Sequence, residues 1–354
     1  MLIHIVAFFL ALAFSFALIP VVRKRAIAAG LYDAPGERKI HKAPIPRLGG
    51  IAIWSGFTVA ALLLFIILGV APLKGSILGV LAGGAIMFAL GLMDDLFTLS
   101  PYLKLLIQFL AALTAFLLGV QINNLDLPGS QLLVLNVLSL PVTLLWIVGL
   151  SNAMNFIDGV DGLASGVTLI SAITLAVIAH STGQHTSALL AELLAGASLG
   201  FLAFNFHPAK IFMGDSGSLF SGFMLASIAV TGVLKTQVVV MLLPLFVLCV
   251  PIMDITFSVF RRLFRGQNPF LPDADHIHHQ FIKAGVSQVH TVSYLYTLCI
   301  VGGLIATYYV NKEEMTYLIF YVGLVSGVYL LALILIQVVR RLYSKEAVQE
   351  IGQA

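Results

Sequence analysis

Charged residues are scarce in this sequence. Asp, Glu, Lys and Arg together make up 10% of its 354 residues, whereas soluble domains contain about a quarter. Hydrophobic residues make up 60%, and the mean hydropathy is +1.03. This composition excludes a water-soluble fold. Alternating strands of about ten residues are also absent, so the pattern does not favour a membrane β-barrel, and we expect an all-α, polytopic membrane protein.

Cysteine is nearly absent as well. Cys249 and Cys299 both lie in apolar runs, and neither belongs to a CxxC pair or to a Cys/His cluster with metal-binding spacing. We therefore expect two buried thiols that act as small apolar side chains. The phosphate-binding sequence GxxxxGK[ST] is missing too, which excludes a nucleotide held by a P-loop.

Long apolar runs separated by short polar segments dominate the chain. Each run is long enough to cross a hydrocarbon core of roughly 30 Å as a helix. The first run, 2–20, lacks the basic start and the cleavage site of a signal peptide. We expect one integral membrane domain over 1–354 with about eleven spans: 2–20, 48–68, 76–93, 103–120, 132–150, 163–181, 186–204, 217–234, 237–259, 290–310 and 316–339.

The distribution of Lys and Arg predicts the orientation, because cytoplasmic loops retain positive charge. With the N-terminus outside and the C-terminus in the cytoplasm, 16 of the 19 Lys and Arg residues are cytoplasmic. Only Lys74, Lys235 and Lys312 fall on the other side. The acidic residues also gather at the cytoplasmic face, although they contribute little to this rule. Their clustering therefore needs another cause.

Asp94 and Asp95 end the run 76–93. Two adjacent carboxylates at the end of an apolar helix repel each other, and a metal ion or a shared proton would relieve that repulsion. A solvated helix end is the alternative, and the pair alone does not decide between them.

A second polar segment, 151–162, follows the run 132–150. It contains Asn152, Asn155, Asp158 and Asp161 within a dozen residues. Asp and Gly in this pattern could simply cap the next helix. Asn is disfavoured inside helices, however, and both Asn residues fall where the helix should continue, which favours a ligand-binding site.

The third segment, 205–218, contains Asn205, Lys210, Phe212 and Asp215. Asp215 could be only the cap of the following helix. Carboxylates that hold Mg²⁺ next to a lysine are, however, what a metal-diphosphate site needs.

The fourth segment, within the loop 260–289, contains Asp273, Asp275 and three histidines, His276, His278 and His279. It has no HExxH pattern and no cysteine ligand, so we expect hydrogen bonds to phosphate or sugar rather than zinc. No role is assigned to Asp254, Asp273 or Asp275. Glu192, within the run 186–204, is unexplained, and the histidines at span ends, His4, His180, His185 and His290, are expected at the membrane interface.

In this order, these segments resemble the polyprenyl-phosphate N-acetylhexosamine-1-phosphate transferases, the family of WecA, TagO and MraY. The resemblance covers almost the whole chain and rests on five motifs: Pro46-Arg-Leu-Gly49-Gly50, Asp94-Asp95, Asn152-Ala-Met-Asn155 through Asp158-Gly-Val-Asp161-Gly162, Phe212-Met-Gly-Asp215-Ser-Gly-Ser218, and His276-Ile-His278-His279. Each motif is weak alone, but five in sequence are specific.

The resemblance implies a reaction in which a polyprenyl phosphate attacks the β-phosphate of a UDP-N-acetylhexosamine and releases UMP, with Mg²⁺ required and Mn²⁺ as a substitute. It implies that Asp215 and Asn155 bind the metal, that Asp94 deprotonates or positions the lipid phosphate, and that Asp95 assists Asp94 or the metal. It also implies that the histidine motif, with His278 as a catalytic residue, contacts the sugar phosphate or the sugar. It further assigns the other substrate-binding positions: Lys42, Lys104, Asn152, Asp158, Asp161, Asn205 and Phe212, the last three in the uridine pocket.

The interrupted histidine motif and the eleventh span are more similar to the WecA and TagO branch than to MraY. The resemblance therefore implies UDP-GlcNAc and undecaprenyl phosphate as substrates, a bacterial cytoplasmic membrane location with the site on the cytoplasmic face, and a homodimer. No nucleic-acid partner is expected. An MraY-type transferase using the pentapeptide donor is the alternative within the family.

Two alternatives from other classes remain. A secondary transporter would use Asp94, Asp254 and Glu192 as ion sites, but it predicts carboxylates near the bilayer midplane and inverted repeats, which the sequence does not show. A scaffold protein would need neither paired Asp residues nor Asn-rich loops.

Overall fold

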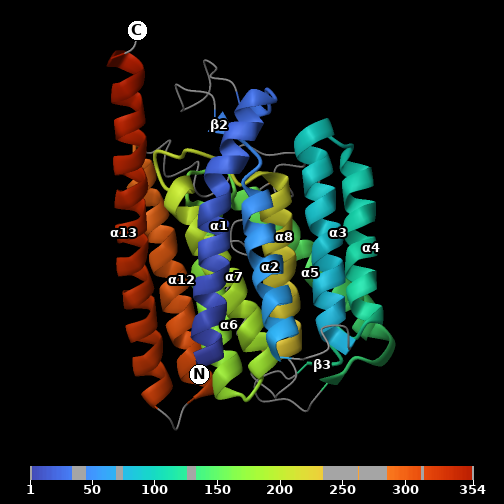
Figure 1. Cartoon of the computed structure of the whole chain (residues 1–354). Helices are drawn as coiled ribbons and strands as arrows, with labels where there is room; N and C mark the ends of the chain where they lie inside the picture. Colours follow the sequence, from blue (N-terminus) through green and yellow to red (C-terminus); the bar gives the residue numbers. More distant parts are fainter. Residues whose placement is uncertain are drawn as a thin grey trace.

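The structure is a bundle of helices that run roughly parallel or antiparallel to one another (Figure 1). It is a computed structural model and describes residues 2–33, 45–68, 75–125, 133–233, 262, 285–311 and 315–352. The helices are α1 Leu2–Ala28, α2 Gly50–Leu68, α3 Gly75–Phe97, α4 Pro101–Leu117, α5 Ser139–Ile157, α6 Leu163–Ser181, α7 His185–Asn205, α8 Gly214–Ile228, α12 Gln288–Val310 and α13 Met315–Gly352.

Short irregular elements complete the fold. A 3₁₀ turn at Asn136–Leu138 leads into α5, and a π-helical segment at Ala229–Val233 continues α8. There are also four two-residue strands among the described residues. β1 Tyr32–Asp33 pairs antiparallel with β2 Ile45–Pro46, and β3 Asn124–Leu125 pairs antiparallel with β4 Leu133–Val134. In the first pair Tyr32 faces Pro46, and in the second Asn124 faces Val134.

Within the described ranges, eight helices are long and apolar enough to cross a membrane: Leu2–Ala28, Gly50–Ile67, Gly75–Phe97, Asn136–Ile157, Leu163–Ser181, His185–Asn205, Gln288–Val310 and Met315–Tyr343. Each coincides with one predicted span, and the chain is a multi-pass membrane protein. The predicted span 103–120 is the shorter apolar helix Pro101–Leu117, and the predicted span 217–234 is α8 with its π-helical continuation. The predicted span 237–259 lies outside the described residues, so the total of eleven stays a prediction.

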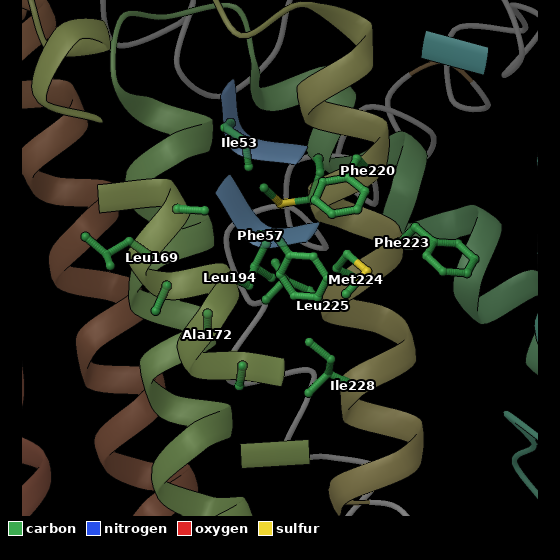
Figure 2. Close-up of a cluster of buried hydrophobic side chains, with 14 of the residues drawn as sticks. Ile53, Phe57, Leu169, Ala172, Leu194, Phe220, Phe223, Met224, Leu225 and Ile228 are labelled. Atoms are coloured by element: carbon green, nitrogen blue, oxygen red, sulfur yellow. The ribbon is translucent and has the colours of Figure 1, made fainter. Parts of the chain in front are cut away.

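Helices α6 and α7 form the centre of the bundle. In each of them 94% of the apolar window is buried, against 22 to 50% in the other six. They pack against each other and against helices that include α1, α2, α12 and α13. Figure 2 shows side chains of α2, α6, α7 and α8 meeting in one apolar cluster, among them Phe57, Leu169, Leu194, Phe220 and Met224.

Small residues let α1 and α7 approach closely. A Cβ atom on Gly196 would lie 2.1 Å from the carbonyl oxygen of Phe8, and one on Gly200 would lie 2.7 Å from that of Leu12. Glycines four residues apart form one face of a helix, and such faces pack tightly in membranes. The two helices therefore run side by side, and the pairs His4–Glu192, Phe8–Gly196 and Leu12–Gly200 are each separated by 188 positions.

Candidate functional site

Three helix ends meet at one end of the bundle and bring the predicted acidic clusters together. Asp94 and Asp95 lie in the last turn of α3, Asn155 lies near the end of α5, and Asp215 lies in the first turn of α8. Asp158 follows α5 directly. The sequence separates these residues by up to 121 positions, and the fold joins them through hydrogen bonds.

Lys104 of α4 connects two of the carboxylates. Its Nζ donates to Asp215 Oδ2 at 2.6 Å and to Asp94 Oδ2 at 2.8 Å. The other oxygen of Asp94 accepts the backbone N–H of Leu99 at 2.7 Å. The other oxygen of Asp215 accepts from Asn155 Nδ2 at 3.0 Å. The carboxylate of Asp215 therefore contacts a cation with one oxygen and an amide with the other. These contacts show that Asp215 is more than a helix cap.

Asp95 points toward a different partner from Asp94, because adjacent residues on a helix diverge by about 100°. Its carboxylate accepts the backbone N–H groups of Asp215 at 2.8 Å and Ser216 at 3.0 Å, and the Ser216 hydroxyl at 2.6 Å. The first N–H groups of a helix have no partner within the helix and attract negative charge. Asp95 therefore caps α8 from the end of α3 and holds Asp215 in place.

The motif Pro46-Arg-Leu-Gly49-Gly50 clamps the segment that precedes α8. Phe212 N–H donates to the Pro46 carbonyl at 2.7 Å, and Gly49 N–H donates back to the Phe212 carbonyl at 2.9 Å. A Cβ atom on Gly50 would lie 2.2 Å from the backbone nitrogen of Gly217. The glycine is therefore needed for the start of α2 to reach the start of α8.

Gly214 is required by its backbone conformation. Its φ is +73°, in the left-handed region that only glycine adopts without strain. A Cβ atom there would also lie 2.2 Å from the Arg47 carbonyl oxygen. Gly214 therefore sets the turn that brings Asp215 to the carboxylates of α3.

The site concentrates negative charge around a single ammonium group among the described residues. Burial, together with repulsion from Asp215, Asp95 and Asp161, holds the pKa of Asp158 well above its usual range. Burial also raises the pKa of Asp215, and the Lys104 ammonium offsets part of that rise. A bound cation would relieve this repulsion.

The donor set suits a hard divalent cation. Asp94, Asp158 and Asp215 offer carboxylate oxygens, which are the ligands that Mg²⁺ prefers, and Lys104 already bridges two of them with positive charge. Asn155 donates through its amide nitrogen to both Asp215 and Ser218. In this arrangement its amide nitrogen orients the Asp215 carboxylate.

Asn152 has its contacts elsewhere. Its Nδ2 donates to Gln108 Oε1 at 2.6 Å and to the Val148 carbonyl at 2.8 Å, and its Oδ1 accepts from Gln108 Nε2 at 3.2 Å. Gln108 is only 2% exposed. This reciprocal amide pair joins α4 to α5.

The three residues predicted to bind uridine lie in the turn before α6 and at or just after the end of α7. Asp161 accepts from His207 Nδ1 at 2.9 Å and from the backbone N–H of Ala209 at 3.1 Å. Asn205 is buried, accepts from Gly162 N–H and the Ser165 hydroxyl, and donates to the Ile211 carbonyl.

Phe212, the third of these residues, is partly exposed. Four predicted residues lie outside the described ranges: Lys42, His276, His278 and His279. The same holds for the unassigned residues Asp254, Asp273 and Asp275.

Sequence reasoning missed several partners. Ser216 completes the cap at Asp95, Ser218 accepts from Asn155 at 2.9 Å, and Gln108 pairs with Asn152. Ser218 follows Asp215 by three residues, so helical spacing could have found it. Gln108, a polar residue inside an apolar run, was also a usable signal.

Comparison with known sequences agrees with this geometry. The sequence profile of glycosyl transferase family 4 matches residues 77–233, which include most of α3, all of α4 to α8 and every carboxylate described above. The chain is 36% identical over 296 residues to a probable undecaprenyl-phosphate N-acetylglucosaminyl 1-phosphate transferase of Bacillus subtilis, covering 83% of this chain and 81% of that protein.

Two further relatives have similar names. A decaprenyl-phosphate N-acetylglucosaminephosphotransferase of Mycolicibacterium smegmatis is 37% identical over 78% of this chain and 74% of its own length. An undecaprenyl-phosphate alpha-N-acetylglucosaminyl 1-phosphate transferase of Escherichia coli is 31% identical over 74% of this chain and 72% of its own. The chain belongs to glycosyl transferase family 4, within its group of membrane-bound sugar-phosphate transferases.

Proposed function

We propose that this protein transfers N-acetylglucosamine 1-phosphate from UDP-GlcNAc to undecaprenyl phosphate, giving undecaprenyl-diphosphate-GlcNAc and UMP. One observation carries the proposal: three carboxylates and a lysine converge where apolar helices end. A lipid acceptor can reach such a site from the membrane, and a nucleotide donor can reach it from water. The names of the relatives support the substrates.

Mg²⁺ is the proposed cofactor, with Mn²⁺ as a substitute. When bound, it would neutralise diphosphate oxygens and stabilise the charge that develops on the transferred phosphoryl group. Asp215 would hold it, with Asp158 facing the same space and Asn155 close to the metal. The raised pKa values of Asp158 and Asp215 support this assignment, because they reflect repulsion and burial that a cation would relieve.

The remaining residues bind and orient the substrates. Lys104 and Lys42 would hold phosphate oxygens, and Asp94 would position or deprotonate the lipid phosphate. Asp95 would act by fixing the start of α8, since its oxygens already accept three hydrogen bonds from that turn. Positioning of this kind supplies most of the rate in phosphoryl transfer.

The donor would lie against the turns after α5 and α7. The Phe212 ring would stack on uracil, and Asp161 would accept from the nucleoside. Asn205 would support this pocket from the protein side, because its amide holds residues 162, 165 and 211 together. His276, His278 and His279 would contact the sugar phosphate.

The proposal also includes the membrane arrangement. Eleven spans, an external N-terminus and a catalytic site on the cytoplasmic face of the bacterial cytoplasmic membrane agree with the distribution of Lys and Arg. The N- and C-termini lie at opposite ends of the bundle (Figure 1), as an odd number of spans requires. We propose a homodimer and a role at the first membrane step of a cell-envelope polysaccharide.

The decisive experiment measures UMP release by the purified protein. It would be incubated with undecaprenyl phosphate, Mg²⁺ and, in separate reactions, UDP-GlcNAc, UDP-GalNAc and UDP-MurNAc-pentapeptide. We expect UMP with UDP-GlcNAc, and none when either the lipid phosphate or Mg²⁺ is omitted. Folded protein that releases no UMP from any donor would overturn the proposal, and UMP only from the pentapeptide donor would assign the chain to the MraY type.

A further inference from the structure

Three histidines and a glutamate gather at the end of the bundle opposite the carboxylate site. His4 lies in the first turn of α1, His180 in the last turn of α6, and His185 begins α7. Glu192 lies two turns further along α7. The helix α6 separates this group from Asp161 by 19 residues, about 28 Å at 1.5 Å per residue. No residue proposed for the transferase reaction belongs to it.

Glu192 receives a hydrogen bond on each of its oxygens. His4 Nδ1 lies 2.7 Å from Oε2, and His180 Nε2 lies 2.7 Å from Oε1. A carboxylate only accepts hydrogen bonds, so both ring nitrogens must be the donors. In neutral rings this leaves a lone pair on His4 Nε2 and on His180 Nδ1. A carboxylate that fixes the tautomer of a histidine in this way is the usual neighbour of a metal-binding imidazole.

The packing of α1 on α7 holds His4 in place. Glu192, Gly196 and Gly200 follow one another at intervals of four along α7, and they face His4, Phe8 and Leu12 of α1. The close approach at both glycines prevents α1 from sliding along α7. His4 therefore meets Glu192 as part of the register of the two helices.

His185 does not contribute to the hydrogen bonds of the Glu192 carboxylate. The carboxylate already has both of its partners, and His185 is exposed, with no hydrogen bond to any described residue. Its ring centroid nevertheless lies 6.4 Å from that of His4 and 6.2 Å from that of His180, while those two rings lie 4.3 Å apart. One potential ligand atom from each of the three rings lies within 4.8 Å of the others.

We propose that His4, His180 and His185 form a binding site for a transition-metal ion of the zinc class, with Glu192 orienting two of the rings. Imidazole nitrogen favours Zn²⁺, Ni²⁺ and Cu²⁺ over Mg²⁺ and Ca²⁺. Nitrogens at 2.0–2.1 Å from a tetrahedral ion lie about 3.3 Å from one another. The three ligand atoms, which lie within 4.8 Å of one another, must therefore close by up to about 1.5 Å to reach this spacing. The ion would tie the start of α1 to the α6–α7 turn.

The experiment measures zinc bound by the purified full-length protein. After treatment with a chelator, the protein is equilibrated with Zn²⁺ in excess Mg²⁺, which occupies oxygen-ligand sites, and its metal content is determined by mass spectrometry. We expect one zinc per chain in the wild type. His185→Ala should weaken zinc binding at least tenfold in a chelator-competition titration. His290→Ala, which removes an exposed histidine outside the cluster, should leave it unchanged.

Comparing Asp215→Asn with His185→Ala tests whether zinc binds to the histidines or to the carboxylate site. Asp215→Asn should keep the zinc, and zinc that is lost in Asp215→Asn but retained in His185→Ala would overturn the proposal. A wild type that binds no zinc would do the same. Because His185 is exposed, its variant should fold, and the elution profile of each variant on size exclusion verifies this.

Spectroscopy identifies the ligands directly. Co²⁺ substituted for Zn²⁺ should give the strong visible bands of a tetrahedral, nitrogen-bound ion, and His185→Ala should abolish them. Glu192→Gln should weaken zinc binding about 10- to 100-fold, the usual effect of removing a carboxylate that orients a histidine ligand. Unchanged affinity in Glu192→Gln would remove its orienting role, and weak octahedral Co²⁺ bands would contradict the site.

Discussion

The carboxylate of Asp95 accepts the backbone N–H of Asp215 at 2.8 Å, so the last turn of α3 caps the first turn of α8. Asp215 in turn presents its own carboxylate to Lys104 and Asn155. The position of the proposed metal ligand therefore depends on a second acidic residue that is already committed to hydrogen bonds. Asp95 therefore caps α8, whereas the carboxylate of Asp215 contacts Lys104 and Asn155 and is the proposed Mg²⁺ ligand.

Replacing Asp95 should affect stability and catalysis together. Asp95→Ala removes three hydrogen bonds and leaves two N–H groups of α8 without their partner, which should lower the free energy of unfolding by about 1 to 3 kcal/mol. Thermal unfolding in detergent measures this loss, and UMP release should fall because Asp215 is no longer fixed. Ser216→Ala, which removes one of the three bonds, should give a smaller effect in the same direction. Full activity in a destabilised Asp95→Ala would show that the cap serves folding alone.

Asp215→Asn should stop the reaction while preserving the fold. The amide keeps the volume of the side chain but removes the charge proposed to hold Mg²⁺, and we expect kcat to fall by at least about 100-fold. Turnover would be measured by UMP release at saturating substrates and several Mg²⁺ concentrations. Asp126 lies between the predicted spans 103–120 and 132–150, on the outer face if the N-terminus is outside. Asp126→Asn is therefore the matched control and should retain activity. A loss that high Mg²⁺ fully restores would indicate a weakened metal site rather than an essential one.

Lys104 should oppose metal binding and support substrate binding at once. Its ammonium lies 2.6 Å from Asp215 and 2.8 Å from Asp94, so Lys104→Met leaves the two carboxylates uncompensated. We expect Mg²⁺ to bind this variant more tightly, as measured by the Mg²⁺ dependence of donor binding, while turnover falls at least about tenfold. Lys104→Arg keeps the charge but has a planar, forked group, and it should retain part of the activity. Weaker Mg²⁺ binding in Lys104→Met would contradict this arrangement.

Asn152 and Gln108 should behave as a pair. Their reciprocal amide contacts join α5 to α4, and polar contacts between membrane helices contribute on average about 0.6 kcal/mol. A double-mutant cycle with Asn152→Ala and Gln108→Ala should give a coupling energy of that order in unfolding experiments. The KM for UDP-GlcNAc should change little. A raised KM in Asn152→Ala without coupling to Gln108 would instead support the substrate-binding role implied by the family resemblance.

The membrane class and the convergence of the acidic clusters could be predicted from the sequence, because hydropathy and charge act over the length of a single helix. The partners within the site could not. Asp94 and Asp95 are adjacent in sequence, and their pattern predicts a shared metal or proton, yet one contacts Lys104 and the other caps α8. The cap depends on how α3 packs against α8, whose first turn lies 120 residues later in the chain, and no local pattern encodes that register.

The partners of Glu192 could not be predicted from the sequence either. Inside an apolar run it has no evident partner in the sequence, whereas the fold supplies His4 from a helix 188 residues away and His180 from the neighbouring helix. The motif Pro46-Arg-Leu-Gly49-Gly50 is recognisable in the sequence only by resemblance. Its physical reason, the close approach of Gly50 to Gly217, is evident only in the folded structure.

Gly91 offers a direct test of that close packing. It lies on α3 one turn before Asp95, and a Cβ atom there would lie 2.4 Å from the carbonyl oxygen of Asp215, which is backbone and cannot turn aside. Gly91→Ala should therefore push α8 away from α3, lower the temperature of unfolding and reduce UMP release at least about tenfold, since a misplacement of about 1 Å can cost 100-fold in rate.

Gly149 of α5 is the matched control for this substitution. A Cβ atom at Gly149 would have no neighbour within 4 Å, and alanine in a helix is more stable than glycine by about 0.5 to 1 kcal/mol. Gly149→Ala should therefore keep full activity and unfold at the same or a higher temperature. Equal behaviour of the two variants would mean that α3 and α8 can separate without harm, and the coupling of Asp95 to Asp215 would then lose its structural basis.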